Sequence, residues 1–363
     1  MNTKPAVTAL TFGLGLTLLV CLWAGRAPTS VRAEVDAPPV LPADRLASLD
    51  PTSPTTPVRL IFIHHSTGEN WLADDNGGLG ITLRDHNYFV SDTYYGWGPP
   101  DQDVGYDTIG DHTDIGHWYN WFVGPHRNTY LAALYAESGR HSPSYYSRLP
   151  TNPGGENRII VFKSCFPNSA LGGNPSDPPT MGSNPLRGQD SGSEHHTVAN
   201  AKGIYDDLLT YFATRQDKLF IVTTAPPLAS GETTPEQAAN ARAFNTWLVN
   251  DWLANYPYNN VAVFDFYNVL TTNGGDPDTN DLNQPTGNHH RYLNGVIEHI
   301  TNQGGNTSAY PTGDSHPSQA GNLKATGEFV PLLNIYPFVD DLHRDPRFQA
   351  FLERLRFPRS ASR

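Results

Sequence analysis

The stretch VRLIFI at residues 58–63 is an apolar run interrupted only by Arg59. A run of this length, without alternation of polar and apolar residues, is typical of a strand covered on both faces of a parallel sheet. Residues 64–72 follow at once and read HHSTGENWL, which predicts a tight turn from the strand into a helix. Because strands followed directly by helices build α/β folds, this stretch decides the fold class.

Four further apolar runs of strand length follow along the chain, and helical patterns separate them. The predicted strands cover residues 89–95, 158–163, 219–224 and 261–266, and the clearest predicted helices cover residues 199–212, 235–255 and 319–333. This alternation predicts a mainly parallel, five-stranded sheet with right-handed crossovers. The chain also holds 32 glycines and 31 prolines, which predicts long loop insertions. We therefore expect one α/β domain over residues 58–340.

The composition excludes several classes of protein. With 38% hydrophobic and 17% charged residues, the chain can build a core, which excludes wholesale disorder, a coiled coil and collagen. The formal net charge is −12, and the dense arginine cluster lies at the extreme C-terminus, so nucleic acid is a poor partner. The sequence does not indicate an oligomeric state.

The two ends of the chain have patterns of their own. A signal peptide is predicted over residues 1–33 from Lys4, the apolar stretch at 6–24 and the residues before Glu34. We therefore expect a secreted or cell-surface protein of bacterial type. An uncleaved N-terminal anchor is the alternative, and it is the membrane contact that the sequence indicates. Residues 34–57 hold six prolines and predict an extended linker, and residues 341–363 predict a basic amphipathic helix and tail.

Ser66 stands where the first predicted strand turns into a helix. Ligands of parallel sheets gather at the carboxyl ends of the strands. A hydroxyl on such a turn is exposed at the edge of the sheet, and the helix N-terminus favours developing negative charge, which fits a nucleophile. The alternative is a plain N-cap serine that forms a capping box with Glu69.

Polar groups also follow the second and third predicted strands. The second strand runs into a glycine-rich turn that contains Gly98, and the third runs into a turn that contains Asn168. Backbone N–H groups of Ser66 and Gly98, together with the side-chain amide of Asn168, are the donor types that a tetrahedral oxyanion needs. Glycine and asparagine are also ordinary turn residues, so a purely structural role is the alternative.

An acid and a histidine share one loop late in the chain. Residues 313–316 read GDSH, immediately before the last predicted helix. A serine nucleophile needs a base, and His316 can serve as one while Asp314 holds its tautomer. The alternative is that Asp314 is a loop residue and His316 is merely exposed.

The order of these parts resembles the SGNH/GDSL hydrolase superfamily over roughly residues 58–338. The matching residues are Ser66, Gly98 (or Gly96), Asn168, Asp314 and His316, with Pro317, Ser318 and Gly321 extending the last block. The resemblance implies a three-layer α/β/α flavodoxin-like fold and a serine esterase that needs no cofactor. Two features depart from the family: His64-His65 precedes the serine where Gly-Asp is usual, and D-x-H replaces D-x-x-H.

We expect the substrate to be a small-molecule or polysaccharide ester, with an acetylated polysaccharide favoured because aromatic faces stack on sugar rings. The expected substrate-binding residues are His65, Trp97 and Trp118. His289 and His290 are expected in a loop, and Cys165 is expected to pack as a small buried side chain.

Two other functions compete with the esterase. Four potential ligands of a metal-dependent hydrolase lie within seven residues, namely Asp111, His112, Asp114 and His117. They do not follow an established zinc spacing. The other alternative is a catalytically silent, cell-surface glycan-binding domain that keeps the fold.

Overall fold

The computed structural model describes residues 51–103, 105, 107–276 and 278–336. The predicted signal peptide (1–33) and the predicted C-terminal helix and tail (341–363) lie outside the described residues. Of the predicted linker, the last part is described. The backbone carbonyls of Pro51 and Pro54 accept hydrogen bonds from Asn334 and Asn87, so this part of the linker lies against the domain.

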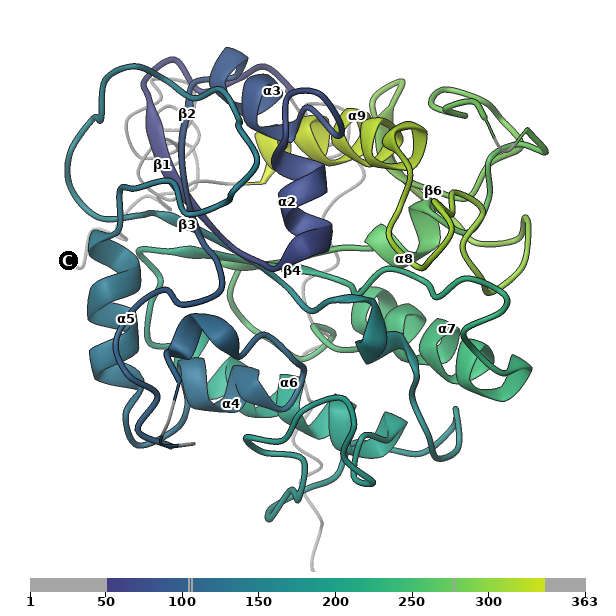
Figure 1. Ribbon diagram of the computed structural model, residues 1–363, viewed down its shortest axis with the longest axis horizontal. Coiled ribbons are helices and arrows are strands. Elements are labelled where there is room, and N and C mark those ends of the chain that lie inside the picture. The colour runs from purple at the N-terminus through teal and green to yellow at the C-terminus, as the bar shows by residue number, and fades with distance from the viewer. Residues whose placement is uncertain (1–50, 104, 106, 277, 337–363) are drawn as a thin grey trace, which may run out of the picture. The chain divides into compact units, whose positions relative to one another are not determined.

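Five strands of the described residues form one parallel sheet in the order β2-β1-β3-β4-β5 (Figure 1). They are β1 (Val58–Ile63), β2 (Tyr88–Thr93), β3 (Ile159–Lys163), β4 (Leu219–Thr223) and β5 (Val261–Phe264), and each is buried along its whole length. This is the strand order of flavodoxin-like folds. The predicted fold class is confirmed, and each predicted strand end lies within two residues of the observed one.

Helices cover both faces of the sheet and make three layers (Figure 1). One face carries α2 (Ser66–Leu72), α3 (Leu79–Asp85), α8 (Phe266–Val269) and α9 (Gln319–Ile335), and the other carries α4 (His117–Phe122), α5 (Arg127–Ala136), α6 (Val198–Phe212) and α7 (Pro235–Asn250). Alternate residues of β1 point to the two faces: Ile61 and Ile63 pack with α4 to α7, while Leu60 and Phe62 pack with the other set.

The predicted helix at 235–255 is too long, because α7 ends at Asn250. The backbone N–H of Trp252 donates to the carbonyl of Trp247, five residues back, which closes the last turn. Trp252 is buried in the core just beyond this turn.

The long predicted insertions are present. The connection from β2 to β3 holds η1 (Ile109–Asp111), α4 and α5, and η2 (Phe166–Ser169) follows β3. His289 and His290 are not in a loop: they begin a hairpin of β6 (His289–Leu293) and β7 (Val296–Ile300). Its turn is Asn294-Gly295, with φ of 51° and 88°, the left-handed pair that two-residue hairpins favour.

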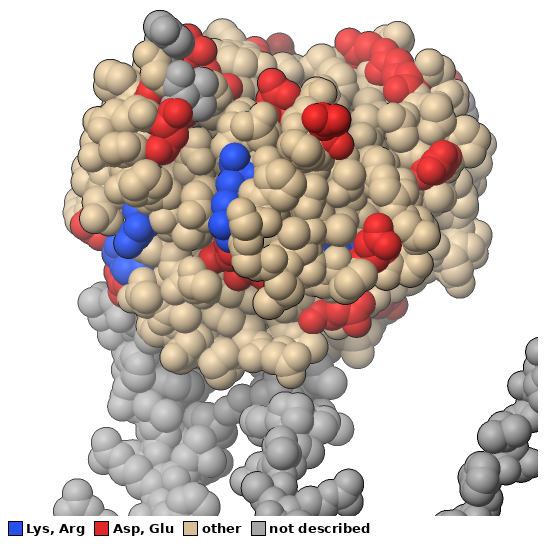
Figure 2. Space-filling view, turned by 90° about the horizontal axis from the view of Figure 1, so that it is seen from below, with Lys and Arg blue, Asp and Glu red and all other residues tan. Residues whose placement is uncertain are grey.

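The surface agrees with the net charge. On the face in Figure 2, acidic side chains are spread widely and lysine and arginine side chains are few. Within the described residues, no helix combines the length and the apolar character needed to cross a membrane.

Candidate active site

Ser66 lies at the point of the sheet where ligands of such folds bind. Strand β1 pairs with β2 on one side and β3 on the other, so the connections diverge at its carboxyl end. Ser66 is the first residue of α2, and its N-cap is His65. The capping-box alternative does not form, because the Glu69 carboxylate accepts hydrogen bonds from Tyr94 and Ser144 instead. The Ser66 hydroxyl is therefore not used as a helix cap.

Ser66, His316 and Asp314 form one hydrogen-bonded series. The Oγ of Ser66 lies 2.8 Å from Nε2 of His316, and Nδ1 of His316 lies 3.0 Å from Oδ2 of Asp314. A carboxylate only accepts, so Nδ1 carries the proton and Nε2 offers its lone pair to the serine hydroxyl. The backbone amide of His316, followed by its imidazole, lowers the pKa of Asp314, which keeps this carboxyl ionised at neutral pH.

The loop that carries Asp314 and His316 is anchored by Ser315, which lies between them. Ser315 is fully buried; its hydroxyl donates to the Glu232 carboxylate and accepts the N–H of Ala229 at 2.8 Å. The chain bends through residues 312–316, and the backbone N–H of His316 donates to the Asp314 carboxylate at 2.8 Å. This bend therefore brings the carboxylate to the imidazole.

Aromatic packing holds both partners of the serine–histidine pair. The ring of Phe166 contacts that of His316 edge-on, with centroids 4.8 Å apart. Trp71 of α2 is fully buried, stacks on Phe266 and donates from Nε1 to Thr326 of α9 at 2.9 Å. Helix α2 is thus tied to α8 and α9.

Gly68 allows the first turn of α2 to approach the preceding strand end. A β-carbon at this position would lie 2.3 Å from Cβ of His64, whose side chain is fully buried. A larger residue would push the turn that carries Ser66 away from the sheet.

His65 lies beside the serine, but its ring nitrogens are not free for a substrate. Nε2 donates to the carbonyl of Gly110 at 2.8 Å, and Nδ1 accepts from the hydroxyl of Thr113 at 3.0 Å. Burial lowers the pKa of His65 to about 4, so the ring is neutral at neutral pH. One face of the ring stacks on Tyr95, with centroids 3.7 Å apart. The residue open to a ligand is therefore Tyr95, which is 53% exposed and which the sequence patterns did not single out.

Trp97 and Trp118 lie in the core rather than at the surface. Trp97 is 5% exposed, stacks on Trp121 and donates to Glu137. Trp118 is fully buried and donates to Ser164. Both indole N–H groups are satisfied inside the protein, so neither ring is available for the substrate binding expected of it.

The two residues expected to add oxyanion donors beside the backbone N–H of Ser66 are Asn168 and Gly98. The side-chain amide of Asn168 donates to Asp114 at 2.6 Å and to the carbonyl of Cys165 at 3.2 Å, so both its hydrogens are engaged. Gly98 has φ of 88°, and its neighbours pair with η1 residues. Among the described residues, Gly98 makes no hydrogen bond with Ser66. Their oxyanion role stays a prediction.

Cys165 borders Ser66 rather than simply filling the core. Its Sγ lies 3.7 Å from Oγ of Ser66 and 3.2 Å from Oγ1 of Thr67. Lys163, two residues earlier, is completely buried, and its ammonium group donates to the carbonyl of Ser164. Burial lowers the pKa of Lys163. A thiol therefore lines the site beside the serine.

The four residues of the metal alternative do not converge. The Asp111 carboxylate accepts from Gly96 and Thr108, and the Asp114 carboxylate accepts from Asn168 and Ser191. Within the described ranges, no group of three or more His, Cys, Asp or Glu side chains is arranged to hold a metal ion. Hydrogen bonds within the protein occupy both carboxylates.

Comparisons of the chain with protein-family models, with curated proteins and with solved structures gave no match. The function must therefore be inferred from the side chains themselves.

Proposed function

We propose that this protein is a serine esterase of the SGNH/GDSL type that hydrolyses acyl esters, in particular acetyl esters, through an acyl-enzyme. The observation that supports this most strongly is the 2.8 Å contact between Ser66 and an imidazole whose other nitrogen faces Asp314. Such a relay serves to take a proton from a hydroxyl and return it to a leaving group.

The reaction follows from the direction of these hydrogen bonds. His316 takes the proton of Ser66 as Oγ attacks the ester carbonyl, and the imidazolium then protonates the departing alcohol. Water, deprotonated by the same ring, releases the acid. The backbone N–H of Ser66, in the first turn of α2, has no acceptor among the described residues and is the donor best placed for the oxyanion.

Covalent labelling tests the proposal. A fluorescent alkyl phosphonate is expected to modify Ser66 stoichiometrically, with loss of p-nitrophenyl acetate hydrolysis at the same rate. Peptide mapping identifies the site, and the exposed Ser176 should stay unmodified. An active protein that resists the phosphonate and loses activity with a chelator would instead support metal chemistry.

Asp314→Asn is expected to lower kcat for p-nitrophenyl acetate by about 10²-fold. The asparagine amide would face Nδ1 and favour the tautomer that puts hydrogen on Nε2, where it blocks proton transfer from Ser66. The loss should be smaller than for a buried acid, because Asp314 is 50% exposed and water can partly replace it. Asp278→Asn, another exposed loop carboxylate, is the control. Near-normal turnover in Asp314→Asn would mean that another group orients the ring.

We further propose that the ester is carried on a carbohydrate and that Tyr95 supports the sugar ring. One face of Tyr95 is backed by His65, its edge contacts Tyr94, and 53% of it is exposed. His65 precedes Ser66 directly, so this rigid aromatic face lies next to the nucleophile. A flat, fixed ring with a polar hydroxyl can stack on the apolar face of a pyranose.

Tyr95→Ala is expected to raise KM for an acetylated xylo-oligosaccharide about fivefold to tenfold and to leave kcat/KM for p-nitrophenyl acetate unchanged. The reason is that stacking contributes about 1 kcal/mol, and the small ester has no sugar to stack. Tyr95→Trp should retain the low KM. Tyr258→Ala, an exposed tyrosine just before β5 at the opposite edge of the sheet, should change neither value. An equal loss on both substrates would contradict sugar stacking.

A further inference from the structure

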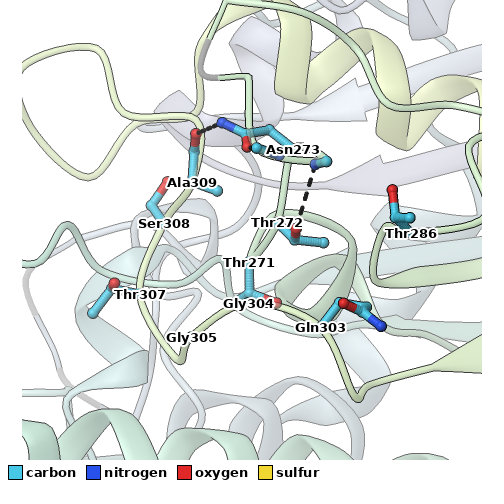
Figure 3. A pocket seen from close by; sticks show the side chains of 12 residues that line it. Thr271, Thr272, Asn273, Thr286, Gln303, Gly304, Gly305, Thr307, Ser308 and Ala309 are labelled. Atoms are coloured by element: carbon cyan, nitrogen blue, oxygen red, sulfur yellow. Dashed lines mark hydrogen bonds between the residues drawn. The ribbon is translucent and has the colours of Figure 1, made fainter.

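A cavity of about 490 Å³ lies between the segments that flank the β6–β7 hairpin, and Ser66 and His316 do not line it. Its size falls within the range of about 300–1,000 Å³ that is usual for small-ligand sites. The lining residues are 271–275, 286, 303–305 and 307–309, and every one of their side chains is uncharged. Figure 3 shows Thr286 and Gln303 on one side of the opening and Thr307 and Ser308 on the other.

The lining selects against charged and apolar ligands. An ion placed here would lose hydration without a counter-charge from the wall. An apolar ligand would meet threonine, asparagine, glutamine, serine and glycine, with Ala309 as the sole aliphatic side chain of the lining. A neutral polyhydroxylated molecule matches such a wall, because each hydroxyl can both donate and accept.

Arg242 and Lys324 do not line the cavity, but both donate hydrogen bonds to residues that do. Arg242 donates to Oγ1 of Thr271 at 2.7 Å and to the carbonyl of Gly305 at 3.2 Å. Lys324 donates to the carbonyl of Thr272 at 3.2 Å and pairs with Asp281. Asn273 also donates to the carbonyl of Ala309, which ties the two lining segments together (Figure 3). The wall is therefore fixed before a ligand arrives, which lowers the entropy cost of binding.

The front of the wall keeps its hydrogen-bonding groups available. Among the described residues, the side chains of Thr286, Gln303 and Thr307 have no hydrogen-bond partner within the protein. A β-carbon on Gly305 would meet no atom within 4 Å, so open space lies in front of this glycine. These groups face solvent until a ligand replaces the water.

We propose that this cavity binds a neutral saccharide, as a site separate from the catalytic series. The lining segment that ends at Ala309 continues into the loop of His316, seven residues further on, so the two lie within about 25 Å of each other. One polysaccharide chain can therefore contact both. The inference goes beyond the proposed esterase activity and does not depend on it.

Isothermal titration calorimetry on Ser66→Ala, which cannot turn over an ester, tests this site. Xylohexaose and cellohexaose are the neutral probes, and a hexamer of galacturonic acid is the charged one. We expect saturable binding of at least one neutral probe and none of the charged probe. Adding Thr286→Val and Gln303→Ala should weaken that binding at least tenfold, and adding Gly305→Leu, which fills the open space, should do the same.

Controls separate this site from the esterase. Thr210→Val with Gln216→Ala, at the C-terminal end of α6 and just beyond it, should leave saccharide binding unchanged. In the protein that retains Ser66, Thr286→Val with Gln303→Ala should leave p-nitrophenyl acetate hydrolysis unchanged. The inference is overturned if neither neutral probe binds, if the charged probe binds more tightly, or if the cavity variants bind normally. Saccharide binding in a protein without esterase activity would support the cavity and contradict the proposed function.

Discussion

Ser66→Ala is expected to reduce p-nitrophenyl acetate hydrolysis by at least about 10³-fold, because it removes the hydroxyl that is hydrogen-bonded to the proposed base His316. The variant should fold normally. The Ser66 side chain makes no helix-cap bond, so its removal should change the free energy of unfolding by about 1 kcal/mol or less.

Steady-state kinetics and urea unfolding check both parts of this expectation. Ser176→Ala, which removes an exposed loop serine, is the control and should behave like the unmodified protein. A Ser66→Ala protein that folds and still hydrolyses the ester would overturn the serine mechanism. The neighbouring thiol of Cys165 would then be the first alternative nucleophile to test, since its Sγ lies 3.7 Å from the lost hydroxyl.

His316→Ala should be about as damaging as the loss of the serine, again by about 10³-fold or more, because the hydroxyl then has no base. Its structural cost should be modest, since the ring is 24% exposed and its main packing contact is the edge of Phe166. The loop keeps its anchor through Ser315.

Added imidazole separates a missing base from a damaged site. Imidazole at high concentration should restore part of the activity of His316→Ala, because a free ring can occupy the space left beside Ser66, and it should restore none in Ser66→Ala. His195→Ala, an exposed histidine outside the site, should keep full activity. Full activity in His316→Ala would refute the relay.

The strands were predictable because each is a short apolar run buried on both faces, and the relay because its members follow strands or precede the last helix. The burial of the two tryptophans expected to bind substrate was not predictable. Tryptophan is a common sugar-binding residue, but the indole N–H groups of Trp97 and Trp118 donate inside the protein to Glu137 and Ser164, which are remote in the sequence. Tyr95, by contrast, is exposed, and sequence periodicity does not report exposure at a turn.

Asn168 shows a second limit of the sequence. An amide after the third strand fits an oxyanion donor, but its partners come from residues 114 and 115, in the long insertion after β2. The hairpin of β6 and β7, by contrast, had a readable signal: Asn294-Gly295, a dipeptide that favours two-residue hairpin turns, lies between them. The same pattern would have moved His289 and His290 from a loop into a strand.

The hydrogen bond between Ser66 and His316 joins residues 250 positions apart. The serine belongs to the first strand–helix unit and is synthesised early, whereas its base belongs to the loop before α9. A nascent chain that has not yet reached residue 316 therefore carries a correctly shaped nucleophile with nothing to activate it. Such non-local contacts form late in folding. The proposed reactivity therefore requires the first strand–helix unit and the loop before α9 to have come together.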